Sequence, residues 1–227
     1  MPVKELNNSK QRLASVLEPA EREELMLAML RDVLTAIERV ALFDGVLLVS
    51  RSQRAKALAR DFVNDVYMES TGSDHSRAVA EGNQYLIERY QVDTSLAISS
   101  DLPRVTAQDI HRIIEHHDRV TLVPNAGDEG TNAVLTSPPN AISYHFGPNS
   151  LIQHVASAEA GGITPSIVRI PNLAHDIDDP QDLEQAILDL PSSFTRSFID
   201  SSGIAARLGR PGREVTSPPG VRSTVWT

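Results

Sequence analysis

Apolar residues recur at helical spacing between residues 18 and 41, which is the clearest pattern in the chain. The stripe consists of Leu25, Met29, Val33, Ile37 and Val40. Pro19 stands near the start of this stretch and acidic residues occupy the first turn, as is typical of a helix N-terminus. The pattern predicts a long helix with one buried face.

Two short apolar runs, residues 45–50 and 96–99, indicate strands. Neither run alternates with polar residues, which is typical of strands buried on both faces of a parallel sheet. A helical pattern follows each run, over residues 53–63 and 106–116, and the second begins with capping-box spacing. This alternation of strand and helix predicts an α/β fold.

The second half of the chain continues the alternation. Its patterns predict strands at 120–124, 133–136 and 166–170 and a helix at 150–160. Asp179 and Pro180 suit the N-cap and first position of a last clear helix. We therefore expect one domain over residues 1–190. Residues 191–227, which include a stretch rich in Gly, Pro, Ser and Arg, are expected to be a mobile C-terminal extension.

Composition narrows the class of protein. The 227 residues carry a formal net charge of -9, which argues against binding nucleic acid through its phosphates. The chain has no cysteine, so disulfides, thiolate metal sites and cysteine nucleophiles are excluded. No signal peptide is evident, and no stretch approaches the roughly 20 apolar residues of a membrane helix. We expect a cytoplasmic protein that binds neither nucleic acid nor membrane.

Three cations near the N-terminus form the first candidate for chemistry. Lys4, Lys10 and Arg12 fall within one predicted loop directly before a helix. Such a loop could hold a triphosphate and stabilise departing pyrophosphate. On charge alone, a solvated basic N-terminus is the favoured interpretation.

Carboxylates form the second candidate. Asp101 follows a predicted strand, at the sheet edge where ligands collect in open α/β folds, and it would suit a magnesium ion that bridges phosphates. Asp176 and Asp178 are two residues apart, so an extended backbone would place both on one side, where they could complete that site. A turn or cap explains Asp101 equally well, and helix capping is the alternative for the later pair.

An anion pocket is the third candidate. Thr131 and Asn132 follow a glycine, and Gly147 and Ser150 stand just before a predicted helix. Backbone N–H groups and hydroxyls at a helix N-terminus suit a phosphate or a carboxylate. Considered alone, simple capping by Asn149 or Ser150 is the better explanation.

The histidines carry a weaker signal. His111, His116 and His117 share a predicted helix at spacings that place no clean pair on one face, so a solvated surface is favoured over a metal site. His145 and His154 flank the proposed anion pocket and could contact a substrate. The sequence contains neither a P-loop nor a Gly-rich dinucleotide fingerprint.

Taken together, the ordered motifs between Pro2 and Leu190 resemble those of a known family. They are Pro2-Val3-Lys4, Lys10-x-Arg12-Leu13, Val49-Ser50, Asp101-Leu102-Pro103, Gly130-Thr131-Asn132-Ala133, Phe146-Gly147-Pro148-Asn149-Ser150 with His154, and Asp176-Ile177-Asp178-x-Pro180-x-Asp182-Leu183. The chain resembles the 2-phospho-L-lactate guanylyltransferase family of coenzyme F-420 biosynthesis, which includes phosphoenolpyruvate and 3-phospho-D-glycerate guanylyltransferases.

The resemblance implies a fold and a reaction. The fold would be a single-domain, nucleotidyltransferase-like (Rossmann-like) three-layer sandwich with a central, mostly parallel sheet. The reaction would transfer GMP from GTP to the phosphate of phosphoenolpyruvate, 2-phospho-L-lactate or 3-phospho-D-glycerate and release pyrophosphate. The product would pass to a downstream deazaflavin transferase, and a homodimer would be compatible with the family.

The resemblance also implies roles for particular residues. Lys4, Lys10 and Arg12 would hold the GTP phosphates as catalytic groups. Asp101 and Asp178 would hold Mg2+, with Asp176 as a further metal ligand. Thr131, Gly147 and Ser150, together with the neighbouring Asn132, would bind the acceptor acid.

The chain departs from the family pattern in two places. Relatives usually carry several apolar residues before the Pro-Val-Lys motif, so either a clipped first strand or a misplaced start site is expected here. Residues 72–78 stand where many relatives carry Gly-Leu-Asn near the nucleotide, which leaves base recognition and acceptor choice open at this stretch. The alternatives are a transferase for another nucleotide or a sugar phosphate, and a non-catalytic nucleotide-binding homologue.

Overall fold

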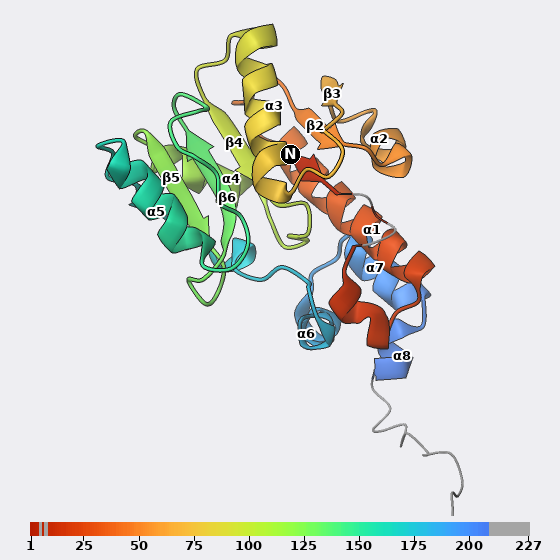
Figure 1. The fold of residues 1–227 in the computed structure, drawn as a ribbon. Helices are drawn as coiled ribbons and strands as arrows, with labels where there is room; N and C mark the ends of the chain where they lie inside the picture. Colours follow the sequence, from red (N-terminus) through yellow and green to blue (C-terminus); the bar gives the residue numbers. More distant parts are fainter. Residues whose placement is uncertain (5, 7–8, 209–227) are drawn as a thin grey trace, which may run out of the picture.

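Helices and strands alternate along the computed structural model, which describes residues 1–4, 6 and 9–208 (Figure 1). In chain order the elements are β1 (Pro2–Val3), η2 (Gln11–Ser15), α1 (Pro19–Glu38), β2 (Leu47–Ser50), α2 (Gln53–Ala59), β3 (Asp65–Tyr67), α3 (His75–Tyr90), β4 (Ser95–Ile98), α4 (Ala107–Glu115), β5 (Val120–Pro124), β6 (Thr131–Thr136), α5 (Ser150–Ala160), β7 (Ser166–Ile167), η3 (Pro171–Leu173), α6 (Pro180–Asp189), α7 (Phe194–Ser201) and α8 (Ile204–Leu208).

The strands form two sets. In the first set β2 lies between β1 and β3, and both pairings are parallel. In the second set the order is β4-β6-β5-β7, where β5 and β7 are parallel while β6 runs antiparallel to both β4 and β5. The apolar run at residues 96–99 predicts a strand in a parallel sheet. This prediction of strand direction is wrong, because β4 pairs antiparallel with β6. A continuous apolar run indicates that a strand is buried on both faces of its sheet, but such burial does not fix whether the strand is parallel or antiparallel to its neighbours.

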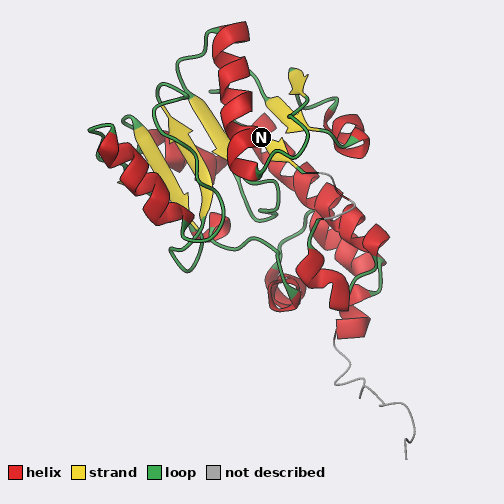
Figure 2. Cartoon of the chain, viewed as in Figure 1, coloured by secondary structure: helices red, strands yellow, loops and turns green. Residues whose placement is uncertain are grey.

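Helices cover both faces of the strands and give the three layers (Figure 2). On one face, α1 and α4 pack against side chains such as Ile98, Val123 and Ala133. On the other face, α3 and α5 pack against their neighbours in the strands, including Ala97 and Val134. Adjacent residues therefore serve opposite faces, as the pleat of a strand requires. The predicted α/β three-layer architecture is confirmed.

Most predicted elements are present within a few residues of the expected ends. Helix α5 and strand β5 have the predicted bounds, the expected short first strand is β1, and Asp179 caps α6 as predicted. The sequence analysis missed β3 and α3. The sixteen residues of α3 include Gly82, where an added Cβ would lie 2.7 Å from Val49 Cγ2, so this glycine lets the helix approach β2 closely.

The ordered chain continues past residue 190, where the sequence pattern weakens. Helices α7 and α8 pack at one end of α1, and Ile199 and Ile204 are fully buried there (Figure 1). The carboxylate of Asp32 in α1 accepts hydrogen bonds from the backbone N–H groups of Phe194 and Thr195 at 2.8 and 2.9 Å. A distant acid thus satisfies two N–H groups at the start of α7, and the local N-cap Ser193 accepts a hydrogen bond from the Arg196 N–H. Of the predicted extension, residues 209–227 lie outside the described residues.

Candidate functional site

Three carboxylates meet beside the end of β4. Asp101 follows this strand, whereas Asp176 and Asp178 belong to the segment between η3 and α6. The carboxylate of Asp182 accepts hydrogen bonds from the backbone N–H groups of Asp178 and Asp179 at 2.9 and 3.0 Å, which fixes the segment as it enters α6. Carboxylate oxygens of Asp101, Asp176 and Asp178 all lie within 4.8 Å of one another. The structure therefore brings together the three acids that the sequence predicted.

Repulsion within this acidic cluster is visible in the pKa of Asp176. Burial raises this pKa from 3.8 to about 7, and the negative charges of Asp101 and Asp178 add to the effect. Three hard oxygen donors at this separation are the ligand type that a magnesium ion prefers. A divalent cation would also offset the crowded charge, so the residues present fit such an ion.

Lys10 is the cation that the protein itself supplies to the cluster. Its Nζ donates to Asp101 Oδ2 at 2.7 Å and also pairs with Asp178, and its side chain is only 5% exposed. Burial alone would lower the pKa of Lys10, but the two carboxylates outweigh burial and hold this pKa above its usual range. Conversely, Lys10 outweighs the effect of burial on Asp178 and holds the pKa of that carboxyl below its usual value. The ammonium is therefore a fixed positive charge beside the acids.

Apolar anchors hold the loop that carries Lys10. Val3, Leu6 and Leu13 are buried in one core cluster, and the Lys10 carbonyl accepts a 2.9 Å hydrogen bond from the Leu13 N–H. Lys10 itself has φ 51°, a left-handed conformation that a residue other than glycine adopts rarely. The loop thus turns sharply so that one cation points inward. Lys10 is therefore buried and ion-paired, so the interpretation of a solvated basic N-terminus is wrong for this residue.

The other two predicted cations have exposed side chains near the same site. The charge of Arg12 acts on Asp178 and contributes to the lowered pKa of that carboxyl. The charge of Lys4 acts on His75, which begins α3. Both cations are therefore close enough to influence the acidic cluster or its surroundings.

A second group of polar side chains lies at the start of β6 and α5. The hydroxyl of Ser150 donates to Thr131 Oγ1 at 3.1 Å, and His154 Nδ1 lies 3.1 Å from the same oxygen. His154 Nε2 accepts a 2.9 Å hydrogen bond from the His145 backbone N–H, so the ring proton is on Nδ1 and points at Thr131. Burial lowers the pKa of His154 to about 4, which keeps the ring neutral. The two predicted residues Thr131 and Ser150 are thus in contact, and His154 donates a hydrogen bond to Thr131.

Gly147 and Asn132 take different positions in this group. Gly147 is exposed, has φ 122°, and its carbonyl accepts a hydrogen bond from the Ser150 N–H, so a glycine is required where the chain turns into α5. Asn132 is buried, and its Nδ2 donates to the Leu173 carbonyl at 2.7 Å. This bond ties β6 to η3, which gives the Asn132 amide a structural contact.

His75 lies beside this group, within residues 72–78, where the sequence departs from the family pattern without singling out a residue. It is the first residue of α3, whose N-cap Asp74 accepts a 2.8 Å hydrogen bond from the Arg77 N–H. The His75 ring lies edge-on to Phe146, with centroids 4.5 Å apart, and the charges of Asp101 and Lys4 both act on it. The signal that could have found it is the N-cap Asp74, because an N-cap at that position starts a helix on His75.

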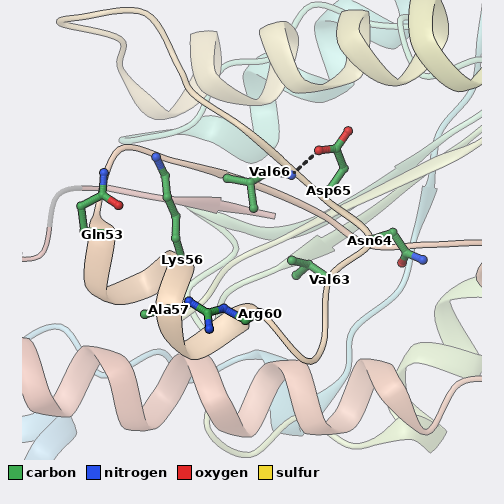
Figure 3. A pocket seen from close by; sticks show the side chains of 8 residues that line it. All are labelled: Gln53, Lys56, Ala57, Arg60, Val63, Asn64, Asp65 and Val66. Carbon is green, nitrogen blue, oxygen red and sulfur yellow. Dashed lines mark hydrogen bonds between the residues drawn. The ribbon is translucent and has the colours of Figure 1, made fainter.

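A separate pocket lies between α2 and β3 and is not part of this site. Figure 3 shows its lining, which includes Lys56, Arg60 and Asp65. None of the residues predicted to bind phosphates, metal or acceptor lines it. The candidate site is instead defined by the convergence of side chains at the strand edge.

The fold places the protein in a structural class. The three-layer α/β sandwich is nucleotidyltransferase-like. The chain is similar in fold to a putative nucleotide-diphospho-sugar transferase from Desulfovibrio desulfuricans, with a TM-score of 0.70, 14% sequence identity, and coverage of 91% of this chain and 95% of that one.

The family follows from sequence. The model of the family described as "Guanylyl transferase CofC like" matches residues 1–216, and the chain belongs to this family. It is 34% identical over 187 residues to a phosphoenolpyruvate guanylyltransferase from Sphaerobacter thermophilus, covering 82% of this chain and 89% of the relative. It is 36% identical over 183 residues to another from Roseiflexus castenholzii, covering 81% and 84%. The chain is thus a nucleotidyltransferase enzyme, and the predicted family is confirmed. No helix among the described residues has the length and apolar character needed to cross a membrane.

Proposed function

We propose that the protein transfers GMP from GTP to the phosphate of a small three-carbon phospho-acid and releases pyrophosphate, as a step of coenzyme F-420 biosynthesis. Phosphoenolpyruvate is the first candidate acceptor, because both relatives described above carry it in their names. 2-Phospho-L-lactate and 3-phospho-D-glycerate are the other candidates. The product would pass to a downstream deazaflavin transferase.

The observation that carries this proposal is the meeting of Lys10 with the acidic cluster. Lys10, Asp101 and Asp178 come from three distant parts of the chain and form one ion-paired group. A site with both charges suits a triphosphate and its cation, because the carboxylates bind the metal while basic groups bind the phosphates. A purely structural ion pair would not need the third carboxylate, Asp176, which places an oxygen within 4.8 Å of those of Asp101 and Asp178 and whose pKa is raised by burial and then by these two charges.

The reaction needs no nucleophile from the enzyme. The acceptor's phosphate oxygen attacks the α-phosphorus of GTP, a new P–O bond forms, and the bond to the β-phosphate oxygen breaks to release pyrophosphate. An ionised phosphate oxygen is already a competent nucleophile at neutral pH. Catalysis is therefore a matter of positioning two anionic substrates and offsetting their charge.

Different residues of this chain would position the substrates and offset their charge, according to where they lie in the site. Lys10, with Lys4 and Arg12 at the exposed side, would offset charge on the leaving pyrophosphate. Thr131 and Ser150, joined by a 3.1 Å hydrogen bond, would orient the acceptor, and the Gly147 turn would present backbone N–H groups to it. Asp101, Asp176 and Asp178 would hold Mg2+, which when bound supplies electrostatic stabilisation of the α-phosphate.

The test is product formation by the purified chain. It is incubated with GTP, magnesium and each of the three acids in turn, and the mixture is assayed for pyrophosphate and, by mass spectrometry, for the guanosine diphosphate-linked acid. Coupling to the downstream transferase captures a short-lived product. The proposal expects one acid to give both products. ATP, CTP and UTP are run as alternatives, and release of pyrophosphate with one of these but not with GTP would contradict the proposal.

A further inference from the structure

His75 links the two halves of the candidate site. Its ring lies against Phe146, with centroids 4.5 Å apart, and the ring of Phe146 lies against His154 at 5.0 Å. His154 Nδ1 in turn lies 3.1 Å from Thr131 Oγ1 in the proposed acceptor pocket. The charges of Asp101 and Lys4 also act on His75. One side chain is therefore connected by ring contacts to the acceptor pocket and by charge to Asp101 of the acidic cluster.

The backbone around His75 is fixed to the same loop. Ser76 Oγ accepts a 2.8 Å hydrogen bond from the Phe146 backbone N–H, which pins the first turn of α3 to the segment leading to Gly147. The N-cap Asp74 holds that turn in helical form. The His75 ring and the adjacent Ser76 hydroxyl thus both contact Phe146, which fixes the start of α3 beside the loop that leads to Gly147.

The imidazole nitrogens of His75 make no hydrogen bond with the described residues, and the ring packs against Phe146. Burial lowers the pKa of His75 to about 4, and the charge of Lys4 adds to this against the opposing charge of Asp101. The ring is neutral at physiological pH, with one N–H to donate and one nitrogen to accept. A neutral donor at a fixed position discriminates ligands by geometry more than by charge.

We infer that His75 is a specificity-determining residue that contacts the phosphorylated acid, donating a hydrogen bond to one of its anionic oxygens. This inference rests on the proposed function. The acceptor must extend from Thr131 and Ser150 toward the acidic cluster, where the α-phosphate is attacked, and His75 packs on Phe146 beside the first group while the charge of Asp101 acts on it. The nucleotide phosphates, by contrast, have Lys10 and Arg12, whose charges act on Asp178, and the exposed Lys4 to bind them.

The experiment separates the two substrates of the same enzyme. Initial rates of pyrophosphate release are measured for the wild type and His75→Ala, varying the acid at saturating GTP and then varying GTP at saturating acid. Loss of a hydrogen bond to a charged group predicts that the Michaelis constant for the acid rises about tenfold or more. The Michaelis constant for GTP should change less than about twofold. His75→Asn, which keeps an N–H donor, should recover part of the loss and replaces His75→Ala if the alanine variant does not fold.

Two controls distinguish direct contact from a disturbed loop. His116→Ala removes an exposed histidine at the end of α4 and should behave as the wild type. Ser76→Ala removes the hydrogen bond to Phe146 without touching the acid, and it should raise the Michaelis constant less than His75→Ala does. An effect of Ser76→Ala as large as that of His75→Ala overturns direct contact, and so does a His75→Ala effect confined to GTP or no effect at all.

Failure of the proposed function has a different signature. If the wild type releases no pyrophosphate from GTP with any of the three acids, the proposed function fails and the role of His75 fails with it. If the wild type is active and His75→Ala keeps the wild-type Michaelis constant for the acid, only the role of His75 is overturned.

Discussion

The Lys10 ammonium nitrogen lies 2.7 Å from Asp101 Oδ2, although the two residues are 91 positions apart in the chain. The pair joins the loop before η2 to the end of β4. Because Lys10 also pairs with Asp178, one buried cation holds together three segments of the site. The same cation faces the carboxylates that we propose to bind Mg2+, so the stability of the site and its metal affinity are linked.

Lys10→Met tests this link. Leaving two partly buried carboxylates without their counter-charge should lower the free energy of unfolding in EDTA by about 1–3 kcal/mol, less than a fully buried pair because the Asp178 side chain is 45% exposed. Magnesium should restore stability more in the variant than in the wild type, because the cluster has gained net negative charge. Thermal unfolding with and without magnesium measures both effects.

The control is Arg54→Met, which breaks exposed ion pairs with Glu23 and Glu24. It should change stability by less than about 1 kcal/mol, with no dependence on magnesium. Equal magnesium effects in the wild type and Lys10→Met would show that Lys10 does not share its site with the metal.

Arg12→Ala tests the exposed side of the basic loop. The Arg12 side chain is exposed, so its removal should leave the melting temperature unchanged, yet its charge reaches Asp178. We expect the Michaelis constant for GTP to rise or turnover to fall by about tenfold, as for one charged contact to a phosphate. Arg39→Ala, at the exposed C-cap of α1, is the matched control. No change in either constant excludes Arg12 from the site.

His154 should make the stability of the protein depend on pH. Its pKa is depressed from 6.5 to about 4, so the folded state favours the neutral ring, and the stabilisation is fully present above pH 6.5. It is lost as the pH falls through the folded pKa near 4. A depression of this size corresponds to at most about 3 kcal/mol.

The check is urea unfolding of the wild type and His154→Leu at several pH values between 4 and 7.5. The stability difference between the two proteins should shrink as the pH falls, because protonation of the unfolded chain penalises only the wild type at that position. A difference that stays constant over this range would mean that His154 does not titrate on unfolding.

Gly82→Ala tests the close contact between α3 and β2. The new Cβ would lie 2.7 Å from Val49 Cγ2, so we expect a loss of about 1–2 kcal/mol in spite of the better helix propensity of alanine. Adding Val49→Ala should offset part of this clash, so the double variant should be more stable than the sum of the single effects predicts. Additive single effects measured by chemical denaturation would contradict a direct clash.

The sequence predicts those parts of the molecule whose signals are local. Periodicity locates α1, a run of β-branched residues locates β5, and the N-cap with proline locates the start of α6. The antiparallel course of β4, by contrast, depends on its pairing with β6, about 35 residues further along the chain, which no local pattern encodes. Helix α7 has a local N-cap in Ser193, but two of its first N–H groups are satisfied by Asp32 in α1, a contact that no local pattern encodes.

The same division holds within the site. The types and order of the acids indicated a metal site, and the structure places Asp101, Asp176 and Asp178 together as predicted. What the sequence could not reveal is the ion pairing of Lys10 with two of them, or the position of His75 against Phe146. Both depend on how separate loops fold over the sheet edge. The metal and substrate roles of these residues stay predictions.

Pyrophosphate release by the wild type and Asp101→Asn tests the central claim most directly. Both proteins are given GTP, magnesium and the acid that the wild type accepts, with Asp128→Asn, which alters an exposed ion pair with Arg169, as the control. We predict wild-type rates for the control and a rate at least about a hundredfold lower for Asp101→Asn, with both variants folded by circular dichroism. Undiminished pyrophosphate release by folded Asp101→Asn would contradict the account.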